Sequence, residues 1–203
     1  MKRLIKLFFW LTTPIQKILQ KLSRQETKIT ESQVKSIVSL IKEGDIVLSF
    51  EYGRLTSILI KGFYNHAAIV TSKVTIMEAV GDQYINGKNI GGVREIELEE
   101  WLYKKDYVAV IRPIYDTDIP NKIAAATSFY FKGKDYDYQF RIDNDSVYCS
   151  ELVYLCYSTA DKDFLNHIND EILPQKYYDL CKDSLTTKMK FQLIKDTRLE
   201  KDN

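Results

Sequence analysis

The amino-acid sequence predicts an α+β domain with a small, largely antiparallel sheet packed by helices. Three observations predict it: short apolar segments of strand length, tight polar connections between them, and longer segments with apolar residues at helical spacing. Tight connections favour antiparallel neighbours, because a parallel pair of strands needs a long crossover. The chain has 203 residues, which suits one domain with a sizeable core.

The expected elements follow in order along the chain. Strands are expected over residues 45–50, 66–70, 74–80, 93–98, 107–114 and 188–194. Helices are expected over residues 30–43, 53–62, 119–132, 146–160 and 173–181. Gly44 and Gly133 mark two of the helix ends, because glycine readily adopts the conformation that ends a helix.

The first 28 residues are expected to form a basic extension outside the domain, which would occupy residues 29–203. The extension carries seven Lys or Arg and one Glu, a net charge of +6, whereas the remainder carries −5. Apolar residues from Leu4 to Leu22 recur near one helical face, which predicts an amphipathic helix, within residues 1–25, on an anionic membrane surface. A helix packed on the domain and a poorly ordered leader are the alternatives.

Composition narrows the function classes and the compartment. Three cysteines without a CxxC pair argue against a zinc site and a disulfide framework, and a reducing setting or one free reactive thiol fits better. The acidic excess of the main body argues against a nucleic-acid-binding domain. We expect a cytoplasmic or membrane-peripheral protein that needs no metal or other cofactor. Export is a weaker alternative, because no small-residue cleavage site follows the apolar run.

The segment "NDSVYCSELVYLCYSTA", residues 144–160, leaves two interpretations of Cys149. A cap at Asp145 or Ser146 would place Cys149 in the first turn of a helix, where unpaired N–H groups and the helix dipole favour a thiolate. Against this, Cys149 shares an apolar helical stripe with Cys156, and free cysteines are commonly buried as small hydrophobes. Taken alone, the segment favours core packing.

His66 and Glu78 reverse that balance. The chain has only two histidines, and His167 lies in a polar segment without an orienting pattern, so His66 is the better candidate for a catalytic base. Glu78 interrupts the apolar strand "VTIMEAV", where a buried carboxylate without a partner would be costly. A solvated strand face or a lysine partner would explain Glu78 equally; the functional interpretation is that it holds an imidazole.

The register of the two strands distinguishes these interpretations. A three-residue loop over residues 71–73 would place His66 directly opposite Glu78, within reach of a hydrogen bond. A two-residue turn would place the two side chains on opposite faces, because strand side chains alternate. We predict the first register. Cys149 is then a nucleophile, His66 its base and later acid, Glu78 the group that orients the imidazole, and the Cys149 N–H an oxyanion donor.

A set of short motifs occurs in a familiar order: "GDIVLSF", "GFYNHAAIV", "IMEAV", "GKDYDYQF" and "DSVYCSELV". Over about residues 40–160 the chain resembles the circularly permuted papain-like cysteine hydrolases, the YiiX/YaeF-like branch of the NlpC superfamily. In that branch the histidine and its carboxylate partner precede the cysteine, as His66 and Glu78 precede Cys149. The resemblance implies a permuted papain-like, NlpC-type fold with a β-barrel-like sheet, and metal-free hydrolysis. It also matches Tyr136 to a tyrosine that lines the oxyanion or substrate pocket.

Three functions remain open. The first is a cysteine hydrolase that cleaves an amide in a small peptide or a peptidoglycan-like fragment through a thioester. The second is a lipid-active acyltransferase or esterase at a membrane surface, which the N-terminus keeps open although "YCSEL" does not match the "NCEHF"-like motif of the lecithin retinol acyltransferase type. The third is a ligand-binding module without activity. The complete Cys-His-Glu set favours an enzyme, and we expect the first function.

Overall fold

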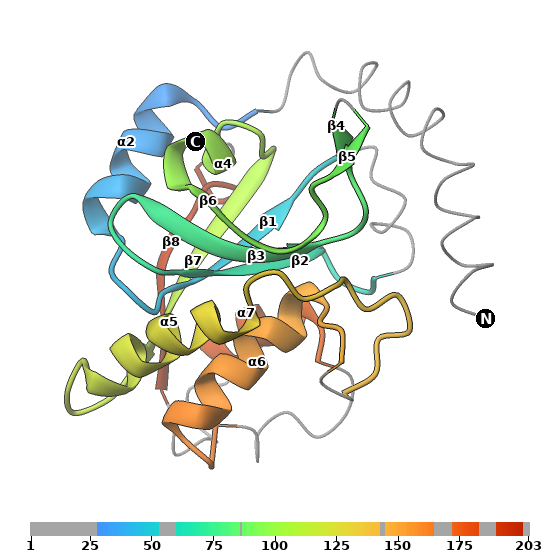
Figure 1. Ribbon diagram of the computed structural model, residues 1–203. Coiled ribbons are helices and arrows are strands. Elements are labelled where there is room, and N and C mark those ends of the chain that lie inside the picture. Colours follow the sequence, from blue (N-terminus) through green and yellow to red (C-terminus); the bar gives the residue numbers. More distant parts are fainter. Residues whose placement is uncertain are drawn as a thin grey trace.

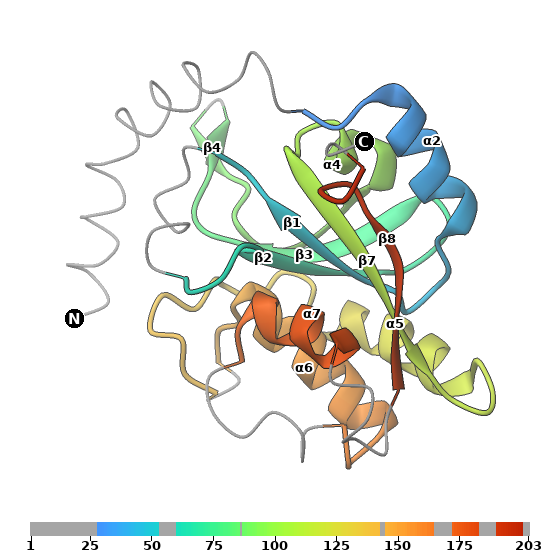
Figure 2. The ribbon, with the colours of Figure 1, turned by 180° about the vertical axis from the view of Figure 1, so that it is seen from behind.

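The computed structural model describes residues 28–52, 60–85, 87–142, 145–164, 172–182 and 190–200. Its centre is a six-stranded sheet with helices on both faces (Figures 1 and 2). The strand order is β6-β3-β2-β1-β7-β8, and every neighbouring pair is antiparallel. The predicted α+β class with an antiparallel sheet is confirmed.

The elements agree closely with the sequence pattern. The strands of the large sheet are β1 (Ile46–Phe50), β2 (His66–Val70), β3 (Thr75–Val80), β6 (Gly92–Glu97), β7 (Tyr107–Ile114) and β8 (Lys190–Asp196). The helices are α2 (Glu31–Leu40), α4 (Leu98–Leu102), α5 (Ile119–Phe131), α6 (Cys149–Ala160) and α7 (Pro174–Lys182). A separate two-stranded sheet joins β4 (Tyr84–Ile85) and β5 (Lys88–Asn89).

Some elements of the structure were not predicted, and some predicted elements lie outside the described ranges. The sequence pattern did not predict α4 or the β4–β5 pair, because elements this short carry too few residues to show a period. The predicted amphipathic helix within residues 1–25 and most of the helix expected over 53–62 fall outside the described residues. Each helix in the described part lacks the length and apolar character needed to cross a membrane.

Two apolar cores lie on the two faces of the sheet. One is formed with α5, α6 and α7, and the other with α2 and α4, as the two opposite views show (Figures 1 and 2). Ala67 and Ile69 face the first core, whereas Ala68 and Val70 face the second. Strand β2 is therefore buried along its whole length, which explains why "HAAIV" is apolar without alternation after its histidine.

The register of β2 and β3 corrects the prediction. Glu78 is paired with Ala68, not with His66. The shift is two residues, and a shift of two keeps every side chain on its original face. His66 and Glu78 are therefore diagonal neighbours on one face, a separation that long side chains can bridge.

The turn between these strands explains the shift. It is a three-residue loop as expected, but it spans residues 72–74, because the Thr71 N–H donates to the Thr75 carbonyl oxygen at 3.1 Å. The Ser72 hydroxyl accepts hydrogen bonds from the N–H groups of Val74 and Thr75, both at 3.1 Å. Ser72 thus closes the turn with its own side chain, which moves the loop one residue along the chain.

Cys149 is the first residue of α6, so its expected place in the first helical turn is confirmed. The expected cap at Asp145 or Ser146 is wrong, because the N-cap is Tyr148. The Glu151 carboxylate, three residues after the cap, accepts a hydrogen bond from the Tyr148 N–H at 3.2 Å. This is the hydrogen bond of a capping box that joins the third helical side chain to the backbone N–H of the cap residue. It stabilises the helix start although Tyr148 is not one of the usual polar cap residues.

An extended segment before α6 sets the position of that start. Val147 forms a parallel bridge with Tyr136. Its N–H donates to the Asp135 carbonyl oxygen at 2.9 Å, and its own carbonyl oxygen accepts from the Asp137 N–H at 3.2 Å. Val147 is consequently held in an isolated bridge rather than in a helix, and the helix begins only after Tyr148.

Candidate active site

The first part of the site lies where β2 begins and β3 ends. Since the two strands are antiparallel, the start of one meets the end of the other. His66 is the first residue of β2, and its Nε2 lies 2.9 Å from Oε2 of Glu78. Both side chains are buried. The structure therefore brings together the histidine and the carboxylate that the sequence analysis singled out.

Glu78 accepts hydrogen bonds from two further side chains. The Trp101 Nε1 donates to Oε2 at 2.7 Å, and the Arg94 Nε and Nη2 donate to Oε1 at 3.0 and 2.8 Å. With the contact from His66 included, each oxygen of the Glu78 carboxylate accepts two hydrogen bonds. Indole and guanidinium groups only donate, so the carboxylate is the acceptor throughout and is held in a fixed orientation.

The surroundings keep Glu78 ionised. Burial is the largest influence on its pKa and by itself raises it. The hydrogen bond to His66 and the charges of His66, Lys105 and Arg94 together outweigh burial, and they hold the pKa of Glu78 well below its ordinary value. Glu78 is therefore an anion at neutral pH.

This anion sets the tautomer of His66. Because Glu78 only accepts, Nε2 of His66 carries a proton, and Nδ1 is the nitrogen left for the cysteine. Burial is the largest influence and lowers the pKa of His66. Hydrogen bonds with Cys149 and Glu78 and the charges of both groups outweigh it, so the pKa of His66 is raised.

Cys149 completes the cluster from α6. Its burial raises the pKa of the thiol and is again the largest influence. The hydrogen bond to His66, the charge of His66 and backbone hydrogen bonds with Ala67 and Ser150 outweigh it, and the pKa of Cys149 is lowered. Cys149 is only 2 % exposed, so its thiol lies inside the protein beside His66.

The other two cysteines lack this environment. Cys156 lies two turns along α6 in the apolar core, where burial alone raises the pKa of its thiol. Burial and then the charge of Asp179 raise the pKa of Cys181 to about 12. Of the three thiols, Cys149 is the one whose surroundings stabilise a thiolate.

The remaining sequence candidates are placed as follows. Tyr136 is buried in the segment that bridges Val147, and its ring packs edge-on against Tyr138 with centroids 5.1 Å apart. It therefore lies beside the chain that leads into Cys149. His167 lies outside the described residues.

Sequence reasoning missed two residues of the site. Arg94 is directly opposite Glu78 in the β3–β6 pair, so a correct pairing of these strands would have found it. Trp101 comes from α4 on the far face of the sheet, and no local pattern connects it to Glu78. Both residues are joined to Glu78 only by the tertiary structure.

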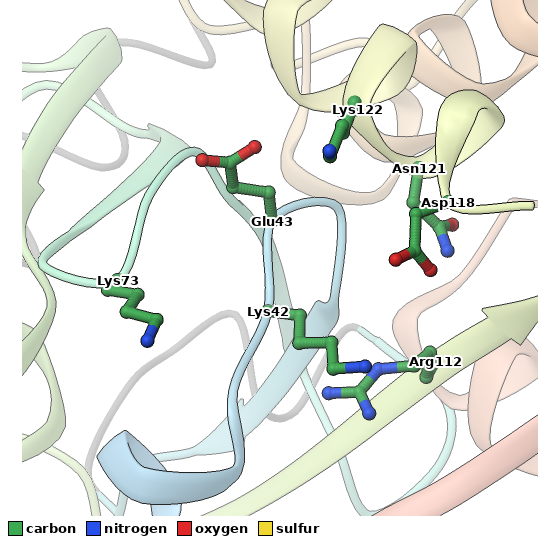
Figure 3. Close-up of a pocket in the computed structure, with 7 residues that line it drawn as sticks. All are labelled: Lys42, Glu43, Lys73, Arg112, Asp118, Asn121 and Lys122. Carbon is green, nitrogen blue, oxygen red and sulfur yellow. The ribbon is translucent and has the colours of Figure 1, made fainter.

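A surface pocket of about 330 Å³ lies away from the cluster of Cys149, His66 and Glu78 (Figure 3). It is lined by Lys42, Glu43, Lys73, Arg112, Asp118, Asn121 and Lys122. The Tyr157 hydroxyl, at 2.9 Å from Oδ1 of Asn121, connects this pocket to α6. Tyr157 is about 12 Å along the helix from Cys149, at a rise of about 1.5 Å per residue. The pocket is thus separate from the candidate active site.

The fold and site together define a class of protein. A cysteine at the start of a helix, packed against an antiparallel sheet that holds a histidine and an acidic residue, is the arrangement of papain-like enzymes. The chain belongs to the family of permuted papain-like amidase enzymes, the YaeF/YiiX or C92 family, whose model matches residues 40–184. Membership of an amidase family supports a hydrolase. The resemblance stated from the motifs is confirmed.

A solved structure supports the fold. It is described as the crystal structure of metalloprotein yiiX from Escherichia coli O157:H7. The two chains are 23 % identical, with a TM-score of 0.50, over 61 % of this chain and 68 % of that one. Comparison with curated proteins gives no significant match.

Proposed function

We propose that this protein is a thiol amidase that cleaves an amide bond in a small peptide or peptidoglycan-like substrate. Cys149 is the nucleophile, His66 the base and then the acid, and Glu78 the residue that orients His66. The observation that carries the proposal is that His66 contacts both Cys149 and Glu78 in a buried cluster. A cysteine buried only for packing would resemble Cys156, whose pKa moves in the opposite direction.

The first half of the reaction forms a thioester. The Cys149 thiolate attacks the amide carbon, and the carbonyl electron pair moves to oxygen. The N–H of Cys149, which is in the first helical turn and has no partner four residues earlier within α6, donates to that oxyanion. The C–N bond then breaks while imidazolium His66 gives the proton on Nδ1 to the leaving nitrogen.

The second half releases the acid. A water molecule attacks the thioester, neutral His66 takes its proton at Nδ1, and the C–S bond breaks to return the Cys149 thiolate. Glu78 stabilises each imidazolium that forms and keeps the ring in place. Tyr136 is proposed to line the substrate pocket, a role that is supported by its position beside the segment leading into α6.

A metal ion does not fit the cluster around Glu78. The related yiiX structure is described as a metalloprotein, which makes the fit worth testing. In the described ranges, no group of three or more His, Cys, Asp or Glu side chains is arranged to hold a metal. The Glu78 oxygens already accept from His66, Trp101 and Arg94, and the guanidinium charge beside them would repel a cation. The proposed steps therefore use no metal.

Thiol labelling across pH tests the proposal. Iodoacetamide is expected to modify Cys149 well below the ordinary thiol pKa of about 8.5, with Cys156 left unmodified in the folded protein. Peptide mass spectrometry locates the label, Cys149→Ala removes it, and His66→Ala moves the reaction to higher pH. Labelling of Cys149 only at the pH of an ordinary thiol, unaltered by His66→Ala, would reject the nucleophile role and favour a binding module.

A further inference from the structure

Asp137 and Tyr138, which lie between α5 and α6, are anchored at the end of the sheet that holds the candidate site. Asp82 follows β3 closely, and its N–H donates to the Tyr138 hydroxyl at 2.5 Å. At the other anchor, the Asp137 N–H donates to the Val147 carbonyl oxygen, two residues before Cys149. Because β3 ends where β2 begins, these two anchors place Asp137 and Tyr138 between the strand end near His66 and the start of α6.

The buried carboxylate of Asp137 shapes the residues that follow it. Asp137 accepts hydrogen bonds from the N–H groups of Gln139 and Arg141, both at 2.7 Å. Phe140 stands between them with φ +53°, and among the described residues it is the one non-glycine residue with positive φ. A bulky side chain rarely adopts this conformation, which persists only when the surrounding contacts impose it.

The side chain held in this conformation stays exposed. Phe140 is 40 % exposed and Ile142 is 51 % exposed. The Phe140 ring packs against Tyr148, the residue before Cys149, with centroids 5.3 Å apart. Core packing does not account for an aromatic ring in a strained backbone that leaves much of its surface in water. Such outliers gather at ligand-binding sites.

We infer that Phe140 forms an apolar wall beside Cys149 that binds an apolar group of the substrate. The inference rests on the proposed amidase function and names the substrate class: amides with an aromatic or aliphatic group next to the scissile bond. Covering the ring removes apolar surface from water in the ground state and the transition state alike. The preference is therefore expected in KM rather than in kcat.

Hydrolysis of four capped peptides tests this inference. One carries two serines, two carry a single phenylalanine on either side of the scissile bond, and one is the two-serine peptide with an octanoyl cap. The wild type should favour the apolar peptides, and the octanoyl arm separates a lipid-like group from a peptide side chain. Phe140→Ser should raise KM about tenfold for the preferred peptides, the effect of exposing one apolar group, and less than twofold for the two-serine peptide.

Two variants separate binding from structure. Phe129→Ser removes a ring on α5 that is 46 % exposed, similar to Phe140, and it should leave every KM unchanged. Phe140→Gly removes the ring but adopts positive φ without strain, so its thermal midpoint should equal or exceed that of the wild type. A fall in that midpoint with an unchanged peptide preference would show that the ring is structural and would overturn the inference.

Binding to Cys149→Ala keeps this test independent of catalysis. Calorimetry with the same peptides should show tighter binding of the apolar ones, lost on adding Phe140→Ser. If the wild type cleaves no peptide but this binding pattern appears, the amidase proposal fails and the apolar wall stands. If the peptides are cleaved or bound with a preference that Phe140→Ser does not alter, the inference of an apolar wall is wrong, and the amidase proposal still stands.

Discussion

The indole nitrogen of Trp101 lies 2.7 Å from the same Glu78 oxygen that accepts a hydrogen bond from His66. Trp101 belongs to α4, which packs on the face of the sheet opposite to α6 and Cys149. The ammonium of Lys105 lies 4.3 Å from the centroid of its ring and helps to hold it. A residue on the face of the sheet opposite to Cys149 therefore orients Glu78, the carboxylate partner of the histidine that contacts Cys149.

Trp101→Phe should impair catalysis without abolishing folding. The change keeps one aromatic ring but removes the donor to Glu78, a hydrogen bond to a charged group that contributes about 1.5–3 kcal/mol. We expect kcat to fall about 10- to 100-fold, as is typical when a residue that positions a catalytic group is replaced. The unfolding free energy, measured in urea, should fall by at least that hydrogen-bond contribution, because the smaller ring also leaves a cavity at this buried position.

Tyr103→Phe provides the control for this change. Tyr103 follows α4 directly and is exposed. The kcat and the unfolding free energy of the Tyr103→Phe protein should therefore remain at wild-type values. An unaltered kcat in Trp101→Phe would mean that His66 and Arg94 are enough to orient Glu78.

Arg94→Gln should destabilise the protein more than the loss of an exposed ion pair. It removes the double contact with the buried Glu78, and breaking a buried pair costs about 3–5 kcal/mol, with the lower end expected because Arg94 is partly exposed. Lys132→Gln breaks the more exposed pair with Glu95 and should cost less than about 1 kcal/mol. Equal urea midpoints for the two variants would contradict this account of the Glu78 cluster.

Glu78→Gln should shift the labelling of Cys149 to higher pH. The anion helps to raise the pKa of His66, and the imidazolium in turn lowers the pKa of Cys149. Without the anion, less imidazolium is present to stabilise the thiolate, so the thiol pKa must rise. We expect the iodoacetamide profile to move up by about one pH unit, an energy of about 1.4 kcal/mol. Identical profiles would remove Glu78 from the proposed triad.

The pH dependence of kcat/KM should be bell-shaped. Activity should rise with pH through the lowered pKa of Cys149, since the thiolate forms there, and this limb should lie below the ordinary thiol value of about 8.5. It should fall through the raised pKa of His66, where the acid for the leaving amine is lost, above the ordinary value of about 6.5. An activity that still rises beyond pH 9 would contradict these assignments.

Residues 1–25 should bind the chain to anionic vesicles. Their basic, amphipathic pattern predicts that the full chain sediments with phosphatidylserine vesicles, while a chain that lacks residues 1–25 stays in the supernatant. High salt should weaken the binding, because the attraction is partly electrostatic. Failure of the full chain to sediment at low salt would leave the division into residues 1–28 and 29–203 without this functional support.

The sequence by itself determined most of the local structure and the order of the motifs. Apolar runs bounded by polar turns fixed β2 and β7, and the polar residues before Cys149 indicated a helix start close to it. His66 and Glu78 could be assigned to one face from the length of their turn, because face depends only on whether the register is odd or even.

The tertiary structure decided what a one-dimensional pattern cannot encode. The Ser72 side chain set the exact pairing of β2 with β3, and the bridge to Tyr136 moved the start of α6 to Cys149. Arg94 and Trp101 reach Glu78 from 16 and 23 residues further along the chain. Contacts at such separations depend on how whole elements pack, and neither periodicity nor capping signals carry that information.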